Sequence, residues 1–427
     1  MHQLINVLEH ANIEYQFSDE KVREFNKLYD ESDPKYLGIH QESEFTDGVL
    51  KATFKSHYYT GYRWLDKEKK TFIRVSPKSY NAYQADYLKM FLECLNDPTV
   101  SKQLNETYEI FFDEEWIEIE ESKDEVTPLI ILHFLKTVKK LTQKGLKKGY
   151  IKVTENLTSK IKGKILVNQT IRQNNFKNRL DRTVCNHQIF TIDCLENQII
   201  KTALMQCGRQ LKGIDSEDIS KLLRQNINAF KLVESREVFN SDFSNIKHSS
   251  FYKEYEEALK LAQMIFKRFG FTLDGSSKDG RYNIPPFYIN MPELFERYVE
   301  VKLREVYKDN LVPGYGQKNG NSYTWGLRPD FIIKDEKIII DAKYKYWFEK
   351  DEVSDWFKDD YQQLSLYGRE KGVREDIGLL NDSEAKIIFI YPHKDGNKSI
   401  VFDQLHKYED TFSNIYKIPL NLPLVKK

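Results

Sequence analysis

The sequence predicts an α/β protein in three parts: a β-rich domain over residues 1–125, a mainly helical region over 126–285 and an α/β domain over 286–427. Three observations predict this division. Segments rich in β-branched and aromatic residues come first, longer segments with apolar residues at helical spacing follow, and the last third alternates helices with short apolar strands. A chain of 427 residues with an apolar fraction of 40% can form about two or three domains with cores of their own.

The first part contains three segments typical of strands, at 51–54, 58–65 and 71–75, with a polar turn at 66–70. A further strand is expected over Phe111–Ile119. The acidic residues between 113 and 125 are too many for one metal site, and they indicate a solvated face or an interdomain segment.

The middle part is expected to be mostly helical, with helices over Leu129–Leu146 and Tyr252–Phe269, the second ended by Gly270. Residues 136–164 contain ten lysines and a single acidic residue, Glu155. This basic stretch is either a surface that contacts DNA phosphates or a solvated face, and the sequence leaves both interpretations open.

The last part opens with a helix that Asn290 caps, because Glu293 follows at the spacing of a capping box. Its polar side is expected to carry Glu293, Glu296, Arg297, Glu300 and Arg304. A second helix is expected over Asp359–Arg369, and strands over Ala385–Tyr391 and Ser399–Phe402.

Between these two helices, residues 328–333 and 338–343 form two short strands joined by a polar turn at 334–337. Pairing across this turn places Asp330 opposite Asp341, with Cβ atoms roughly 4.5–5.5 Å apart. Alternation puts Asp341 and Lys343 on one face of the strand. Two carboxylates this close repel each other unless a cation lies between them, and oxygen ligands suit Mg²⁺. The layout indicates a metal-dependent phosphodiesterase, although an ordinary buried hairpin with charged ends has the same pattern.

Composition and motifs exclude several other classes of protein. The 65 basic and 65 acidic residues cancel, so DNA contact would have to use local patches rather than bulk charge. No apolar run approaches the roughly 18 residues of a membrane span, and the N-terminus lacks signal-peptide features, so a cytoplasmic location is expected. Cys185, His187 and Cys194 do not fit the spacing of a zinc site. The sequence contains no phosphate-binding G-x-x-x-x-G-K-[ST] loop.

Several segments together resemble a known family. They are Phe295–Val299, Leu327–Asp330, Ile340–Lys345 and Asp360–Tyr367 in the last part, Ile161–Ile165, Arg182–Cys185 and Asn197 in the middle, and Gly61–Trp64 and Ile73–Lys78 in the first part. The spacing of Pro329-Asp330 from Asp341-Ala342-Lys343 resembles the PD-(D/E)xK nuclease signature. The whole set resembles McrC, the nuclease subunit of the McrBC modification-dependent restriction systems.

The resemblance implies a restriction-endonuclease-like domain at 286–427 that cuts DNA with Mg²⁺, for which Mn²⁺ could substitute. The catalytic residues it implies are Glu296, Asp330, Asp341, Lys343 and Gln363. The metal ligands would be Asp330, Asp341, the carbonyl of Ala342, and Glu296. Lys343 would orient the attacking water and stabilise negative charge on the phosphate, and Gln363 would position Lys343 or the phosphate.

The family also implies a partner, a McrB-like AAA+ GTPase hexamer on which the chain docks through residues 1–125 and whose hydrolysis it stimulates in defence against foreign DNA. Arg63, Arg74 and Lys78 are candidates for the stimulating residue. Two alternatives stay open: an idle scaffold that only activates the motor, and a self-sufficient sequence-specific restriction endonuclease. The sequence does not indicate whether methylated cytosine is the trigger.

Overall fold

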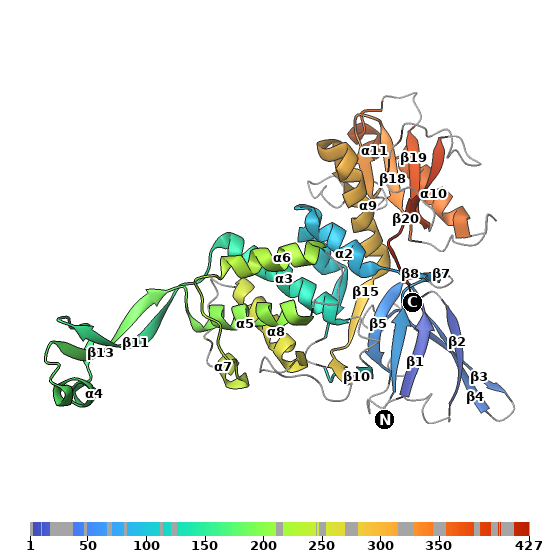
Figure 1. The fold of residues 1–427 in the computed structure, drawn as a ribbon. Coiled ribbons are helices and arrows are strands. Elements are labelled where there is room, and N and C mark those ends of the chain that lie inside the picture. Colours follow the sequence, from blue (N-terminus) through green and yellow to red (C-terminus); the bar gives the residue numbers. More distant parts are fainter. Residues whose placement is uncertain are drawn as a thin grey trace. The chain divides into compact units, whose positions relative to one another are not determined.

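The structure is a computed structural model, drawn as a ribbon in Figure 1. The residues it describes form two compact units. Unit 1 comprises Met1–Ile117 and Pro285–Lys427, and unit 2 comprises Glu118–Ile284. The described residues are 3–9, 11–17, 37–46, 49–65, 71–80, 83–111, 114–120, 126–210, 217–244, 246, 253–269, 281–314, 328–344, 356–379, 385–393, 400, 402 and 414–426. The expected division into three parts stays a prediction, but the first and last parts lie in one unit.

The first sheet of unit 1 has five strands in the order β1-β6-β5-β15-β9. Their bounds are β1 (Gln3–Leu8), β5 (Tyr59–Trp64), β6 (Thr71–Ser76), β9 (Tyr108–Ile110) and β15 (Phe287–Asn290). β1 and β6 are parallel, which brings their carboxyl ends together at one edge of the sheet. The sheet covers a core formed by Ile5, Val7, Leu37, Ile39, Phe54, Leu65, Ile73 and Val75.

β15 belongs to the second segment of unit 1, yet it lies between β5 and β9 of the first segment. Gly61 makes this insertion possible. Its φ of +144° is one that L side chains rarely adopt, and an added Cβ would lie 2.2 Å from the Phe287 carbonyl oxygen. The C-terminal end is tied in the same way, because β21 (Leu424–Lys426) pairs with β8 (Tyr83–Ala85). The two segments of unit 1 therefore share backbone hydrogen bonds in two sheets.

The remaining elements of the first segment are small. β2 (Asn12–Phe17), β4 (Val49–Lys55) and β3 (His40–Thr46) form an antiparallel sheet in that order, and β7 (Ser79–Tyr80) pairs with β8. Helix α2 (Tyr87–Asn96) begins after Asp86, whose carboxylate accepts the Lys89 N–H at 3.0 Å. Two single-turn 3₁₀ helices follow, η2 (Val100–Lys102) and η3 (Leu104–Glu106).

The second sheet of unit 1 carries the predicted hairpin. Its strands, in spatial order, are β16 (Leu311–Pro313), β17 (Phe331–Ile333), β18 (Ile338–Ala342), β19 (Lys386–His393) and β20 (Ile415–Asn421). β16, β17 and β18 pair antiparallel, and β18, β19 and β20 pair parallel. Helix α9 (Met291–Tyr307) continues into η7 (Lys308–Asn310), while α10 (Trp356–Arg369) and α11 (Lys371–Asp376) follow β18 in the chain.

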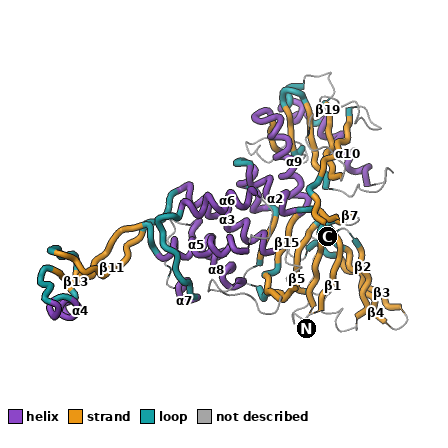
Figure 2. The backbone as a smooth tube through the Cα atoms, viewed as in Figure 1, coloured by secondary structure: helices purple, strands orange, loops and turns teal. Residues whose placement is uncertain are grey.

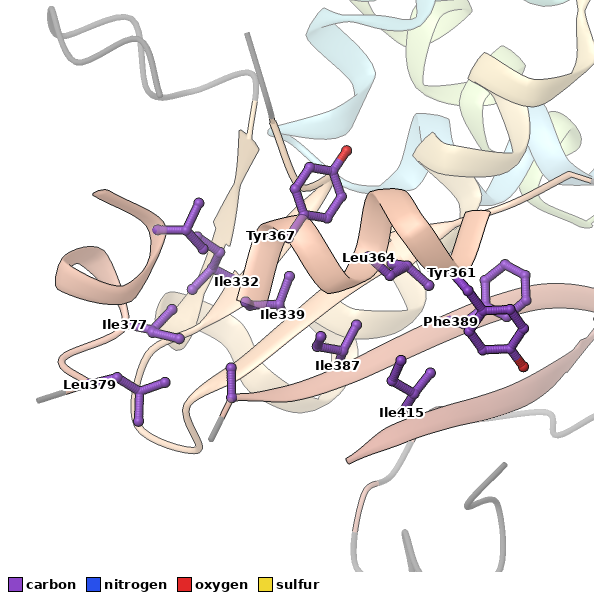
Figure 3. Close-up of a cluster of buried hydrophobic side chains, with 12 residues drawn as sticks. Ile332, Ile339, Tyr361, Leu364, Tyr367, Ile377, Leu379, Ile387, Phe389 and Ile415 are labelled. Atoms are coloured by element: carbon purple, nitrogen blue, oxygen red, sulfur yellow. The ribbon is translucent and has the colours of Figure 1, made fainter. Parts of the chain in front are cut away.

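A hydrophobic cluster joins α10 and α11 to this sheet (Figure 3). Ile332 and Ile339 come from the hairpin, Ile387 and Phe389 from β19, and Leu364 from α10. Because strand side chains alternate between faces, the face that carries Ile339 also carries position 341. Packing of α10 therefore covers the face on which Asp341 and Lys343 were expected.

Unit 2 is built on helices α3 (Val126–Lys144), α5 (Leu195–Gln210), α6 (Glu217–Ala229) and α8 (Lys253–Phe269), with the short α7 (Asn240–Ser244) beside α8. β10 (Ile117–Glu120) pairs with β14 (Arg281–Ile284) where the chain enters and leaves the unit. None of the helices in the described ranges has the length and hydropathy that a membrane span requires.

A long hairpin, which we call the arm, extends from these helices (Figures 1 and 2). The arm comprises residues 149–191: β11 (Gly149–Thr158), β12 (Lys164–Ile165), α4 (Val167–Gln173), the 3₁₀ helix η5 (Asn175–Lys177) and β13 (Arg182–Thr191). Strands β11 and β13 pair over their full length, from Gly149 opposite Thr191 to Thr158 opposite Arg182. At the root of the arm, the Asn197 amide donates to the carbonyls of Lys147 and Ile192 at 2.9 and 2.6 Å.

Several sequence predictions need correction. The middle part is not mostly helical through residues 149–191, because 149–158 alternate between half-buried and exposed residues and pair with 182–191 as antiparallel strands. Of the strand expected over Phe111–Ile119, only the last three residues lie in a strand, β10, because β9 already ends at Ile110 and the Phe111 N–H then donates to the Pro286 carbonyl at 2.8 Å. Ile400 and Phe402 are not in a strand, and the rest of 399–402 lies outside the described residues. β20 was not predicted.

The predicted helices agree better with the structure. α3 begins three residues before the expected Leu129, and α10 begins before the expected Asp359. Asn290 caps α9 as predicted, with its side-chain oxygen accepting the Glu293 N–H at 3.3 Å. Arg297 and Glu300, however, are buried rather than exposed on the polar side of α9. They pair with each other at 3.7 Å, and Glu300 also pairs with Arg304 at 2.7 Å, so the helix buries a charge network. Gly270 lies outside the described residues.

Candidate active site

The hairpin has the register that the sequence predicted. Phe331 pairs with Ile340, Ile332 with Ile339 and Ile333 with Ile338, around a turn at 334–337. Asp330 and Asp341 directly extend this ladder, so they face each other at its open end. The Asp330 carboxylate accepts the Ala342 N–H at 2.7 Å, which fixes it against the end of β18.

Lys343 lies on the same side as both aspartates. Its Nζ is 2.8 Å from Asp341 Oδ2 and donates to Gln363 Oε1 of α10 at 3.0 Å. The Lys343 N–H donates to the Ile390 carbonyl at 2.9 Å, so the backbone at this point is held by β19. Gln363 therefore contacts Lys343 directly, as one of its two predicted roles requires.

Tyr367 completes this chain of contacts, and the sequence interpretation missed it. Its hydroxyl accepts a hydrogen from Gln363 Nε2 at 2.8 Å. Burial, followed by the charges of Asp341 and Asp330, raises the pKa of Tyr367, so the hydroxyl stays protonated beside the carboxylates. The spacing was a usable signal, because residues four apart on a helix lie on one face.

Glu296 enters from α9. Its carboxylate accepts from Arg297 Nη1 at 3.2 Å, and its side chain is 21% exposed, which leaves part of it accessible. Burial raises the pKa of Glu296 to about 7, against the lowering effect of Arg297 and with the support of Glu293 and Asp341. The charge on Asp341 thus raises the pKa of Glu296, although the two residues lie on different elements.

The electrostatics of the site favour a bound cation. Burial, then Asp341 and Glu296, raise the pKa of Asp330 well above its ordinary value. Burial lowers the pKa of Lys343, but Asp341, Asp330 and Asp360 together outweigh burial and the net direction is upward. Lys343 is therefore a cation near neutral pH, and it does not by itself neutralise Asp330, Asp341 and Glu296 when all three are ionised.

The donor set fits a hard divalent ion. Asp330, Asp341, Glu296 and the Ala342 carbonyl offer only oxygen, which Mg²⁺ prefers. Within the described ranges no three His, Cys, Asp or Glu side chains lie close enough together to hold a metal ion by themselves. Mg²⁺ does not require three such side chains, because it usually takes one or two carboxylates and completes its six ligands with water and phosphate oxygens.

Other residues singled out in the sequence are placed elsewhere. Arg63 is buried, pairs with Glu114 at 3.1 Å and lies 4.0 Å above the Phe111 ring. Lys78 is also buried, so neither cation is on the surface of unit 1. Arg74 is half-buried, 5.7 Å from the Tyr62 ring. Cys185 and Cys194 are buried free thiols. Tyr344 packs in the core, whereas Lys345 lies outside the described residues.

Comparison with known proteins decides the family. A family model described as "McrBC 5-methylcytosine restriction system component" matches residues 55–380, a range that includes the hairpin, α9 and α10. This chain belongs to the McrBC family. The family resemblance predicted from the sequence is therefore confirmed. A search of curated proteins gave no match.

Two solved McrBC assemblies from Thermococcus gammatolerans are similar to this chain. One contains McrB AAA+ hexamers with bound McrC; the match has 15% identity and a TM-score of 0.40, and covers 98% of this chain and 94% of that chain. The other is a cryo-EM structure of the McrBC complex; the match has 16% identity and a TM-score of 0.31, and covers 70% and 87%. Membership of the McrBC family rests on the family model.

Proposed function

We propose that this McrBC-family chain is the Mg²⁺-dependent DNA endonuclease subunit of a restriction system, with a PD-(D/E)xK nuclease domain at 286–427. One observation carries the proposal: the Lys343 amine lies between Asp341 and Gln363, on the face and at the strand end where Asp330 meets Asp341. An idle scaffold has no need for this set of contacts. The intact Asp330, Asp341 and Lys343 therefore favour a working nuclease over the scaffold alternative.

In this proposal Asp330, Asp341, the Ala342 carbonyl and Glu296 hold Mg²⁺. The ion, when bound, would polarise the scissile phosphate and lower the pKa of a water molecule. Lys343 remains protonated, so it stabilises negative charge on the phosphate and orients the attacking water rather than removing its proton. Gln363 holds the Lys343 amine in place, and Tyr367 fixes the orientation of the Gln363 amide.

We further propose that the chain docks on an AAA+ GTPase hexamer and stimulates its hydrolysis. Family membership supports this, as does the absence of a nucleotide-binding loop from the sequence. The restriction system, acting on foreign DNA, would then divide DNA translocation and cleavage between two proteins. Recognition of the DNA site, methylated or unmodified, would lie mainly on the partner.

The arm is a second candidate for the docking surface, beside residues 1–125. Its large exposed apolar side chains include Phe176, 80% exposed, and Leu180, 75% exposed. The others are Tyr150, Ile161, Ile165, Val167, Ile171, Ile189 and Phe190, whereas the described part of residues 1–117 exposes only Leu8 and Tyr83 in this way. A concentration of exposed apolar side chains is typical of a protein–protein contact, so we favour the arm.

The arm is also basic, because Lys152, Lys160, Lys162 and Lys164 are exposed on it. Not every lysine of the stretch 136–164 belongs to this exposed surface. Lys136 is buried in α3, and Lys147 pairs with Glu196 at 2.7 Å. The exposed lysines give the arm a charge that suits either an acidic partner surface or DNA phosphates.

Substitution at the hairpin tests the nuclease assignment. Asp341→Ala and Lys343→Ala should each reduce DNA cleavage by at least about 10²–10³-fold, because each removes stabilisation of the transition state. Stimulated GTP hydrolysis and partner binding should persist. Both activities should be measured on the same protein, with Mg²⁺, partner and nucleotide present.

The turn of the same hairpin provides matched controls. Asp335→Ala and Lys334→Ala remove the same groups from exposed positions, so both variants should cut DNA at the normal rate. Normal cleavage by Asp341→Ala would show that the metal site is assigned wrongly. Efficient site-specific cleavage by the purified chain without partner or nucleotide would favour the self-sufficient enzyme.

A further inference from the structure

A buried charged cluster lies next to the candidate site, outside the hairpin itself. Glu9 follows β1 and Lys78 follows β6, at the edge where these parallel strands end together. Both side chains are almost fully buried, at 2% and 3% exposure. They meet Tyr344, the residue directly after Lys343, which is 3% exposed.

The contacts converge on Tyr344. Its hydroxyl donates to Glu9 Oε2 at 3.3 Å, and the same oxygen accepts the Lys78 N–H at 3.2 Å. Lys78 Nζ lies 3.5 Å from the Tyr344 carbonyl oxygen and 4.3 Å from the centroid of its ring. Tyr58 contributes a second ring, 5.2 Å from the same amine. One cation thus contacts both the backbone and the side chain of Tyr344.

Burial of two charges needs an explanation, because replacing such a pair by apolar residues is often neutral or stabilising. Glu9 Oε1 has no hydrogen-bond partner in the described structure, so the cluster is not optimised for stability. Burial raises the pKa of Glu9 to about 7 and lowers the pKa of Lys78 to about 8, although each partly stabilises the charge of the other. An apolar contact in place of these buried charges would stabilise the fold at least as well.

The cluster fixes the backbone directly after Lys343 in the chain. At Lys343 itself, the N–H donates to the Ile390 carbonyl of β19. Beyond Lys343, the Tyr344 carbonyl is held by Lys78 and its ring packs on Phe295, with centroids 5.6 Å apart. Phe295 directly precedes Glu296, so Tyr344 also contacts the helix that carries the third carboxylate.

We propose that Lys78 and Glu9 are positioning residues for Lys343. By clamping Tyr344, they keep the Lys343 amine between Asp341 and Gln363, and the first sheet of unit 1 thereby becomes part of the nuclease centre. This inference rests on the proposed function. It also gives Lys78 a role different from the partner stimulation for which the sequence suggested it.

The test uses the full chain with its partner, nucleotide, Mg²⁺ and a DNA substrate. Lys78→Met retains the length and apolar stem of the side chain but removes the amine. We expect kcat for cleavage to fall about 10–100-fold, the usual effect of losing a group that orients a catalytic residue. KM for DNA and stimulated GTP hydrolysis should stay unchanged, because the DNA-binding and partner-binding surfaces are intact.

The decisive comparison is Lys78→Met in the Lys343→Ala background. If Lys78 acts through Lys343, the residual cleavage of Lys343→Ala should not fall further when Lys78→Met is added. An equal fall in both backgrounds would mean that Lys78 only supports the fold, and the inference would be overturned. Wild-type cleavage by Lys78→Met would overturn it as well.

Two further variants keep the inference testable if Lys78→Met does not fold. Tyr344→Phe removes only the hydroxyl that donates to Glu9, and Glu9→Gln removes only the charge. Tyr344→Phe should reduce kcat roughly fivefold, the equivalent of one hydrogen bond, and again only when Lys343 is present. If Tyr344→Phe and Glu9→Gln both leave kcat unchanged, the clamp has no effect on the reaction.

Glu93→Gln serves as the control. It breaks another ion pair of unit 1, Lys302 Nζ to Glu93 at 2.7 Å, without touching Tyr344, so cleavage should remain normal. Two outcomes distinguish an error in the clamp inference from an error in the proposed nuclease function. Lys343→Ala that cuts like the wild type would contradict the nuclease assignment itself, whereas Lys343→Ala that fails while Lys78→Met cuts normally would contradict only the clamp.

Discussion

At the scale of single residues, the carboxylates of the candidate site couple proton binding to metal binding. The pKa of Glu296 is raised to about 7 from 4.5, and the pKa of Asp330 is raised as well. The metal-free folded state therefore holds protons that the unfolded chain has released. The contribution of Glu296 to the free energy of unfolding should fall as pH rises from about 4.5 through about 7, where Glu296 ionises.

Mg²⁺ competes with these protons, which predicts a pH-dependent stabilisation. The increase in Tm on adding Mg²⁺ should be larger at about pH 8 than at about pH 6, because the ligands must be deprotonated. Asp330→Ala should lose most of the increase, and Asp335→Ala in the turn should retain it. Thermal unfolding with and without Mg²⁺ measures this without any assay of cleavage. An equal increase at both pH values would place the metal away from these carboxylates.

Much of the candidate site could be predicted from the sequence, because the residues that determine it lie close together in the chain. The polar turn between the two short apolar runs of 328–343 determines the register, and the register places Asp330 opposite Asp341. Glu9 and Lys78 could not be predicted, because charged residues are rarely buried and nothing near them in the sequence indicates Tyr344. They lie 335 and 266 residues from it along the chain.

At the scale of elements, the arm is a ribbon of two long strands, β11 and β13, with the two-residue β12 beside β13 and little core, so stability of the fold does not explain its presence. Residues of β11 alternate between half-buried and exposed, and among the described residues of the tip few are buried. Asn156 and Asn174 exchange amide hydrogen bonds at 2.9 Å and hold the tip to the ribbon. An ordered tip that exposes apolar side chains is suited to contact another protein.

Shortening the arm tests whether the arm contacts the partner protein. Replacing residues 159–181 by Asn-Gly joins Thr158 to Arg182, which already face each other, through a favoured two-residue turn. Helices α3, α5, α6 and α8 should keep their stability, while the affinity for the partner should fall at least about tenfold. Phe176→Ala alone should cost about 1–2 kcal/mol of binding if this ring is buried in the contact.

A charge control separates the two possible targets of the arm. Gln at positions 160, 162 and 164 removes three exposed lysines but leaves the apolar tip in place. If these substitutions weaken DNA binding and the shortened arm still binds the partner normally, the arm contacts DNA and docking belongs to residues 1–125. Binding of the partner should be followed by calorimetry, and DNA binding by its salt dependence.

At the scale of the whole molecule, unit 1 is made from two segments that are separated in the sequence by all of unit 2. The sequence did not predict this arrangement, since β15 and β21 have only four and three residues and pair with strands more than 170 residues away. Strands this short have no detectable period. Removal of residues 1–125 would therefore not isolate the nuclease domain but would deprive β15 and β21 of their neighbours.

Removal of unit 2, in contrast, should leave unit 1 folded. β10 and β14 pair where the chain enters and leaves unit 2, so a short Gly-Ser linker in place of residues 121–280 can join them. The resulting chain should unfold in one cooperative transition and show Mg²⁺-dependent stabilisation, because the hairpin, α9, α10 and the Tyr344 clamp all belong to unit 1. It should lack partner binding if the arm is the docking surface. Retention of both Mg²⁺ stabilisation and tight partner binding would return docking to residues 1–117, and a chain that cannot fold would show that unit 1 depends on unit 2.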